Sequence, residues 1–344
     1  MKILIDIGHP AHVHYFRNYY FRMLDKGHKI IIVSRDKEVC FALLKAYKIP
    51  FTSRGSGKQT SFGKLIYMLQ ADWLIYKLAW KFKPDLFLSF ASPYAAQTAF
   101  LTGKPHVALD DTEHARTSRS LYIPFTQTIV TPECYLLDIG KKQVRLPFYA
   151  EFTYLHRNVF KPDHAFAKHI LGMQSDEQFV LLRFISWSAA HDKGHSGIPD
   201  NIKIKLIKSF TDKGFKVFIS SEKKLENEFA EYALQIAPEH IHHVISAAFC
   251  FVGESGTMSN EACILGTPAF LINTLDAGVF RDEVKRGLLF HKKDAVGLIE
   301  FIHNKLNGAN FYEDYAIAHE KLHTDMLDVT DFLINYTESL NKST

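Results

Sequence analysis

Short apolar runs alternate along the chain with longer stretches of helical periodicity. The apolar runs cover residues 2–7, 30–34, 84–90, 106–109, 128–132, 179–184, 216–222, 249–253 and 269–273. Uninterrupted runs of this length are typical of strands buried on both faces, and their alternation with helices predicts parallel sheets. The predicted fold class is therefore α/β, and 344 residues are enough for about two domains of this kind.

A change in composition marks the predicted domain boundary. Aromatic and charged residues fill the connector 148–156, which leads to Phe160-Lys161-Pro162. We expect a first Rossmann-like domain over 1–160 and a second over 161–310, facing each other across a cleft. The segment 311–344 predicts one long terminal helix, over about 311–338, which exceeds what the second domain needs.

The runs 249–253 and 269–273 enclose a helix, so the whole segment predicts a strand–turn–helix–strand unit. With Ser255 as N-cap, the N–H groups of Gly256 and Thr257 lack helical partners and favour an anion such as a phosphate. Glu261 lies one turn below Thr257 on the same face, where a carboxylate would suit a ribose diol. The alternative interpretation is an ordinary capped helix with a solvated Glu261.

Candidate acid–base residues follow two strands of the first domain. Ligands bind at the carboxyl ends of parallel strands, which is where the histidine-containing turn 8–14 and the acidic segment 110–114 fall. Crowding of Asp110, Asp111 and Glu113 should raise the pKa of at least one carboxyl, as a general base near neutral pH requires. The alternative for Asp111 and Glu113 is the acidic first turn of a capped helix.

Further polar residues end strands of the second domain. Arg183 could make paired hydrogen bonds to a diphosphate, or it could form a salt bridge at the strand end. Glu222 ends the run 216–222, where it could contact the ribose, contact the base or have a structural role. His191 lies in a segment, 187–194, that we expect to form a loop over the cleft. The histidine clusters 191–195 and 240–243 lack the ligand spacing of a zinc site, so no metal is expected.

Composition excludes several classes of protein. The chain has 47% hydrophobic and 23% charged residues and a net charge of +4, which gives no indication of a nucleic-acid partner. Cysteines 40, 134, 250 and 263 form no CxxC pair and lie in apolar runs, as reduced core residues do. The chain begins directly with a strand and contains no run of about 18 apolar residues. We therefore expect a cytoplasmic protein without a targeting or membrane-spanning segment.

The unit around Ser255 also resembles a known site. Ser255-Gly256, Thr257, Glu261 and the closing Gly266-Thr267-Pro268 are similar to the nucleotide-sugar site of UDP-N-acetylglucosamine 2-epimerases and of the N-acetylglucosaminyltransferase that forms lipid II. The whole chain resembles a less characterised bacterial and archaeal family grouped beside those enzymes. This resemblance implies the glycosyltransferase B fold, a diphosphate at the Ser-Gly turn, and a uridine ribose at the glutamate. In that fold class the final helix returns to the first domain.

The resemblance extends to single residues of the first domain. The step Ala11-His12-Val13 resembles the Gly-His that follows the first strand of the lipid II enzyme, which implies a catalytic role for His12. Asp110 matches an epimerase glutamate and the acidic step of the lipid II enzyme. Ser92 stands where the epimerases carry a catalytic aspartate, so epimerase chemistry is disfavoured.

Three functions remain open from the sequence. The first is a glycosyltransferase of polysaccharide or glycoconjugate synthesis that uses a nucleotide sugar, most simply UDP-linked, with Asp110 or His12 as base for an unidentified acceptor. The second is a UDP-sugar 2-epimerase in which Asp110, Asp111 and His191 move protons at C2. The third is a non-catalytic nucleotide-sugar-binding protein. None of these requires a cofactor, and Arg183 with the helix end after Ser255 would neutralise the diphosphate.

The segment 64–83 predicts a helix with an unusual surface. Trp73, Trp80 and two tyrosines lie among aliphatic residues, and Lys64, Lys77 and Lys81 are interspersed. This basic and aromatic character is typical of helices at a membrane interface, so we expect peripheral contact with the inner face of the membrane, where a lipid-linked acceptor would be presented. The alternative is a core helix whose aromatic residues pack against the sheet.

Overall fold

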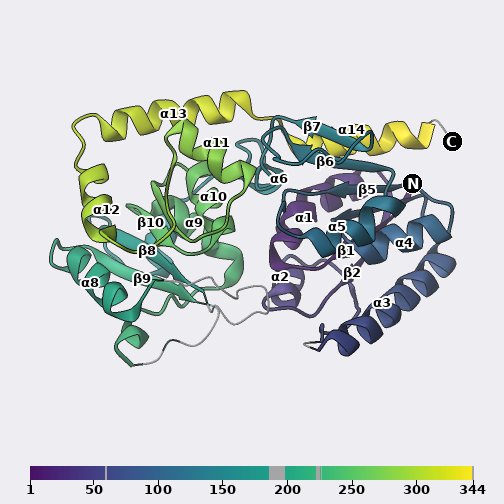
Figure 1. The fold of residues 1–344 in the computed structure, drawn as a ribbon, viewed down its shortest axis with the longest axis horizontal. Helices are drawn as coiled ribbons and strands as arrows, with labels where there is room; N and C mark the ends of the chain where they lie inside the picture. The colour runs from purple at the N-terminus through teal and green to yellow at the C-terminus, as the bar shows by residue number, and fades with distance from the viewer. Residues whose placement is uncertain (59, 186–197, 222–224, 226, 343–344) are drawn as a thin grey trace. The chain divides into compact units, whose positions relative to one another are not determined.

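The computed structural model describes residues 1–344 except 59, 186–197, 222–224, 226 and 343–344. The chain divides into two compact units (Figure 1). The first unit holds Met1–Val159 and Met326–Thr344, and the second holds Phe160–Asp325. Each unit is built on its own parallel sheet with helices packed against it.

The first unit contains a sheet with strand order β3-β2-β1-β4-β5-β6-β7. All its neighbouring strands pair in parallel. The elements, in chain order, are β1 (Lys2–Ile7), α1 (Pro10–Asp25), β2 (Lys29–Ser34), α2 (Cys40–Ala46), β3 (Thr52–Ser53), α3 (Ser61–Phe82), β4 (Leu86–Phe90), α4 (Pro93–Leu101), β5 (His106–Leu109), α5 (Arg116–Tyr122), η1 (Ile123–Phe125), β6 (Thr128–Pro132), β7 (Gln143–Leu146), α6 (Phe152–Leu155) and α14 (Val329–Lys342).

The second unit contains a sheet with strand order β12-β11-β10-β8-β9, again parallel throughout. Its elements are α7 (His164–Ile170), β8 (Phe179–Phe184), α8 (Asp200–Thr211), β9 (Lys216–Ser221), η2 (Asn227–Tyr232), η3 (Pro238–His240), α9 (Ile241–Ala247), β10 (Phe251–Gly253), α10 (Gly256–Ile264), β11 (Ala269–Ile272), α11 (Gly278–Arg286), β12 (Leu289–Lys292), α12 (Leu298–Leu306) and α13 (Phe311–Asp325). The predicted α/β class with two Rossmann-like domains is confirmed.

The terminal segment differs from the prediction of one helix over 311–338. It forms two helices: α13 ends at Asp325 in the second unit, and α14 begins at Val329 in the first. Between them the N–H of Leu327 donates to the carbonyl oxygen of Pro147, and Asp328 Oδ1 accepts the N–H of Asp331 at 3.1 Å. A side chain that accepts the N–H of the residue three positions later caps the start of a helix. Asp328 therefore begins a new helix, which separates α14 from α13.

Helix α14 packs on α1 within the first unit. The hydroxyl groups of Tyr19 and Thr337 lie 2.9 Å apart in the interior, and Lys26 and Glu338 form an ion pair at 2.7 Å nearer the surface. These contacts join α14 to the first helix of the chain.

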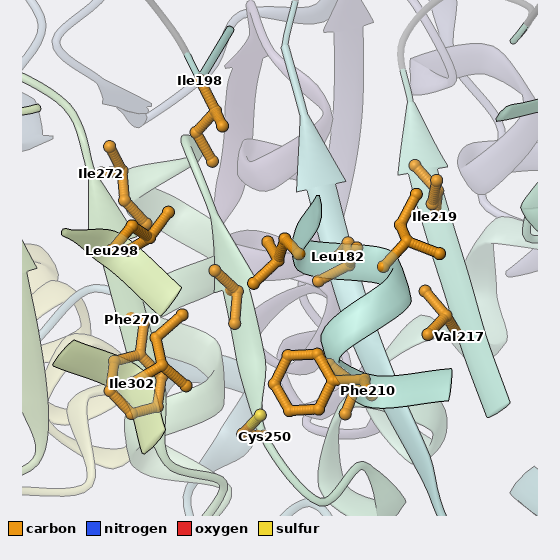
Figure 2. Close-up of a cluster of buried hydrophobic side chains, with 14 of the residues drawn as sticks. Leu182, Ile198, Phe210, Val217, Ile219, Cys250, Phe270, Ile272, Leu298 and Ile302 are labelled. Carbon is orange, nitrogen blue, oxygen red and sulfur yellow. The ribbon is translucent and has the colours of Figure 1, made fainter. Parts of the chain in front are cut away.

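Apolar residues from the strands and flanking helices form the core of each unit. In the second unit the cluster joins Leu182 and Ile219 of the sheet to Phe210 of α8 and Ile302 of α12, as Figure 2 shows. The corresponding cluster of the first unit packs Ile75 and Ala79 of α3 against the sheet; its other buried members are Leu4, Val33, Phe87, Ala95 and Ala99. Because all strands of a unit are parallel, the residues that follow them lie along one edge of each sheet.

Candidate active site

In the second unit, the turn from β10 into α10 has the predicted capped geometry. Ser255 is the N-cap of α10, and its Oγ accepts the N–H of Met258 at 3.4 Å. Ser255, Gly256 and Thr257 are half-buried. Position 256 requires glycine, because a Cβ there would lie 2.4 Å from Cζ of Phe280. The partly exposed helix N-terminus at the carboxyl edge of the sheet is chemically suited to an anion.

Glu261 lies inside the unit and is not solvated. Its Oε1 is 3.0 Å from Nε2 of His242 on α9, and both side chains are buried. The interpretation of a solvated carboxylate is therefore wrong. Burial beside an imidazole fixes the position of the carboxylate one turn below the α10 N-terminus, and the ribose role stays a prediction.

Arg183 and Glu254 end two neighbouring strands. Arg183 Nη1 donates to Oγ of Ser220 at 3.0 Å, which joins β8 to β9. Glu254 is buried, and its carboxylate accepts the N–H groups of Ile185 and Ile198 at 2.8 and 2.5 Å. Glu254, the residue before Ser255, therefore joins Ile185 to Ile198 through its carboxylate.

The sequence analysis assigned no role to Glu254. A carboxylate immediately after a buried strand and before an N-cap serine was the signal that could have found it. Two other candidates, His191 and Glu222, lie outside the described residues.

In the first unit, Asp110 is surrounded by donors. It is buried and accepts the hydroxyl of Tyr122 at 2.5 Å, the hydroxyl of Tyr135 at 3.1 Å and the N–H of Thr112 at 2.8 Å. Burial raises the pKa of Asp110, while the hydrogen bonds to its carboxylate oppose that rise. Three donors on one carboxylate fix it firmly, as a structural or positioning group requires.

Asp111 differs from Asp110 in its surroundings. Its side chain is half-buried, and Oδ1 accepts the hydroxyl of Thr112 at 3.0 Å. Burial and then the neighbouring charge of Asp110 raise the pKa of Asp111 to about 7. A carboxylate that titrates near neutrality can take up a proton at physiological pH.

His12 is held as a neutral hydrogen-bond donor. Nδ1 of its ring accepts the N–H of Gly8 at 3.3 Å, and the ring packs against Phe90 with centroids 4.8 Å apart. Burial and then His9 lower the pKa of His12 well below its usual value. Since Nδ1 is the acceptor, the proton of the neutral ring is on Nε2, so His12 offers an N–H and not a basic nitrogen.

A buried ion pair that the sequence analysis missed lies at the same edge of the sheet. Asp6 in β1 is fully buried; its Oδ1 is 2.8 Å from Nε of Arg54, and its Oδ2 accepts the hydroxyl of Ser92 at 2.5 Å. The guanidinium of Arg54 donates to the hydroxyl of Tyr67 and lies over the ring of Tyr94 at 4.5 Å. An aspartate within an otherwise apolar strand was the sequence signal for this network.

The hydroxyl group of Ser92 makes two hydrogen bonds. Its Oγ caps α4 by accepting the N–H of Ala95 at 3.3 Å, and it donates to Asp6. Within the described part of the chain, no group of three or more His, Cys, Asp or Glu side chains is placed to bind a metal.

Comparison with known proteins places the chain in a family. Residues 1–333 match the family described as "Protein of unknown function (DUF354)". The chain belongs to this family. Protein MJ0665 of Methanocaldococcus jannaschii, which carries the name "Uncharacterized protein", is 23% identical over 318 residues, which cover 89% of this chain and 92% of that protein.

Solved structures show the same architecture at low sequence identity. UDP-GlcNAc 2-epimerase from Neisseria meningitidis, bound to UDP-GlcNAc, has a TM-score of 0.71 and 12% identity, covering 98% of this chain and 100% of that one. The spinosyn rhamnosyltransferase SpnG, complexed with spinosyn aglycone, has a TM-score of 0.65 and 11% identity, with 98% and 100% coverage. The glycosyltransferase B type of fold that the sequence indicated is confirmed, and it is the fold of these epimerase and glycosyltransferase structures.

Proposed function

We propose that this protein is a glycosyltransferase of polysaccharide or glycoconjugate synthesis that uses a UDP-linked sugar. One observation carries the proposal: the N-terminus of α10, capped by Ser255, is partly exposed at the carboxyl edge of the second sheet. A UDP-sugar occupies the Neisseria epimerase, which has the same fold.

The second unit binds the donor in this proposal. The N–H groups of Gly256 and Thr257 receive the diphosphate, and Arg183 adds a positive charge from the neighbouring strand β8. His242 orients Glu261 toward the ribose hydroxyl groups. Arg183 and the α10 dipole balance the diphosphate charge without requiring a divalent cation.

The first unit supplies the acid–base groups. Asp111 takes the proton of the acceptor hydroxyl, the acceptor oxygen forms a bond to the anomeric carbon, and the bond from that carbon to UDP breaks. The electron pair of the broken bond leaves with the diphosphate. His12 donates its Nε2–H to a substrate oxygen. Asp110, held by the hydroxyl groups of Tyr122 and Tyr135, fixes the position of the neighbouring Asp111.

A 2-epimerase is the second candidate, and two observations favour it. The Neisseria epimerase shares the fold over nearly the whole chain, and a carboxyl group with a pKa near 7 could also remove the C2 proton. Ser92 argues against this candidate, because a serine that donates to Asp6 cannot replace the aspartate that resemblance to epimerases would require there.

UDP is expected to raise the melting temperature of the second unit. Binding at about 100 times the Kd contributes about 2.7 kcal/mol to the free energy of unfolding. For a domain of this size that corresponds to roughly 5–10 °C, measurable by scanning calorimetry. The variant Glu261→Gln keeps the shape of the side chain and its contact with His242 but removes the charge, so it should lose most of the shift.

The matched control is Glu313→Gln, which neutralises an exposed acid on α13 of the same unit. This variant should retain the full shift. Equal shifts in the wild type and in Glu261→Gln would contradict the ribose role. No shift in any of the three proteins at millimolar UDP would contradict the donor site itself.

A further inference from the structure

Helix α3, which lies on the outside of the first unit in Figure 1, exposes a row of large apolar side chains. Trp73 and Trp80 are 61% and 73% exposed, and Phe62 is 73% exposed. Leu65 and Leu69 lie between them at helical spacing and are exposed as well. These residues follow one another at intervals of three, four, four and seven positions, which correspond to one or two helical turns, so they form one stripe along the helix. We call this stripe the α3 aromatic face.

The stripe is separate from the surface by which α3 packs on its own domain. Tyr67, Ala71, Ile75 and Ala79 are buried, and they follow one another every four residues on the opposite side of the helix. The interpretation of α3 as a core helix is therefore right for one side only. Its outer side carries apolar area that the fold of the first unit does not use.

Aromatic rings and cations are combined on the outer side. The ring of Tyr76 lies 6.1 Å from that of Trp73 and 6.5 Å from that of Trp80. Nζ of Lys77 lies 5.9 Å from the ring centre of Trp73, and Lys81 is exposed one turn further along. Such rings with neighbouring lysines match the boundary between lipid headgroups and acyl chains.

We propose that the α3 aromatic face docks this protein onto an anionic membrane surface. The charge of the helix selects this occupant over a second copy of the chain. Lys64, Lys77 and Lys81 are exposed, and the helix carries a single acid, Asp72. Two copies packed stripe to stripe would bring like charges together, whereas anionic lipid complements them. Among the described residues no helix is long and apolar enough to cross a membrane, so the contact is peripheral.

Co-sedimentation with vesicles tests the proposal. The wild type should bind vesicles of phosphatidylcholine with 30% phosphatidylglycerol at about 50 mM salt, and binding should fall steeply at about 500 mM salt. Vesicles of phosphatidylcholine alone should bind far less protein. The variant Lys77→Glu/Lys81→Glu should bind at least about 30-fold more weakly, and Trp73→Ala/Trp80→Ala at least about tenfold more weakly.

The matched control is Lys45→Glu/Lys141→Glu, which makes the same charge change at exposed lysines of the first unit that lie outside α3. It should bind within about threefold of the wild type. Circular dichroism and thermal unfolding confirm that each variant is folded; exposed positions should leave the melting temperature unchanged.

Tryptophan fluorescence gives a second readout. The chain has three tryptophans, so Trp187→Phe leaves only Trp73 and Trp80 to report. Their emission should shift to shorter wavelength on anionic vesicles and should be quenched by brominated acyl chains. No binding at low salt, or binding that neither salt nor the lysine reversal changes, would overturn the proposal. So would a wild-type dimer in light scattering that Trp73→Ala/Trp80→Ala converts to monomer, because the face would then be a contact between copies.

Discussion

Replacing Arg54 by methionine is expected to lower the free energy of unfolding of the first unit by about 3–5 kcal/mol. The substitution leaves Asp6 charged and fully buried, with the hydroxyl of Ser92 as its remaining described donor. It also removes the contact of the guanidinium with the ring of Tyr94. Urea unfolding measures the loss of stability, and hydrogen exchange of the amides in β1 and β4 measures it locally.

Two variants separate the buried pair from ordinary surface charge. Asp6→Asn/Arg54→Met should be less destabilised than Arg54→Met alone, because no uncompensated charge remains in the interior. Arg22→Met breaks the ion pair between Arg22 and Asp331 in the same unit. The two side chains are 42% and 48% exposed, so the substitution should lower the free energy of unfolding by no more than about 1 kcal/mol. If Arg54→Met cost no more than Arg22→Met, the buried pair would not support the fold.

Asp111→Asn is expected to lower turnover by about 10²–10⁴-fold, because the amide cannot accept the acceptor proton. In the wild type the rate should rise with pH and level off above a pKa of about 7, since the base acts only when it is deprotonated. Glu133→Gln, which neutralises an exposed acid that follows β6, should leave both the rate and its pH dependence unchanged. The rate is measured as the release of UDP from a UDP-sugar over time.

The same substitution should make the protein more stable at alkaline pH. The folded-state pKa of Asp111 lies above its unfolded value, so the wild type loses stability as pH rises from about 4 through 7. Asp111→Asn removes this loss, and its advantage over the wild type should appear at pH 8 and vanish near pH 4. A merely capping role would instead make the variant less stable at pH 8, by about 1 kcal/mol.

The sequence pattern predicted the inner strands and one edge strand, β9 (run 216–222), but not the other three edge strands. The runs at 2–7, 106–109 and 179–184 correspond to strands β1, β5 and β8, which lie inside their sheets. Strands β3, β7 and β12 also lie at sheet edges; β3 is exposed, and β7 and β12 are mostly half-buried, so none of the three has a long apolar run. Polar residues on the open side of these three strands interrupt the apolar pattern, so periodicity does not reveal them.

The capping role of Ser255 could be predicted from its neighbours in sequence, whereas the partners of Glu261 and Asp6 depend on long-range contacts. An N-cap depends on neighbours in sequence, and the serine before Gly256 has that geometry. The partner of Glu261 is His242, nineteen positions earlier, and that of Asp6 is Arg54, forty-eight positions later. Such pairs follow from how helices and strands pack, which a single sequence does not specify.

The most direct test of a UDP-sugar transferase is proton NMR of UDP-N-acetylglucosamine with this protein in deuterated water. Saturation transfer from the protein should reach the uridine protons, and the C2 proton signal of the sugar should persist through prolonged incubation. Both results follow if the α10 N-terminus holds the nucleotide and the chemistry takes place at the anomeric carbon. Deuterium at C2 would contradict this account and establish epimerase chemistry, and absent saturation transfer would contradict the nucleotide-sugar site.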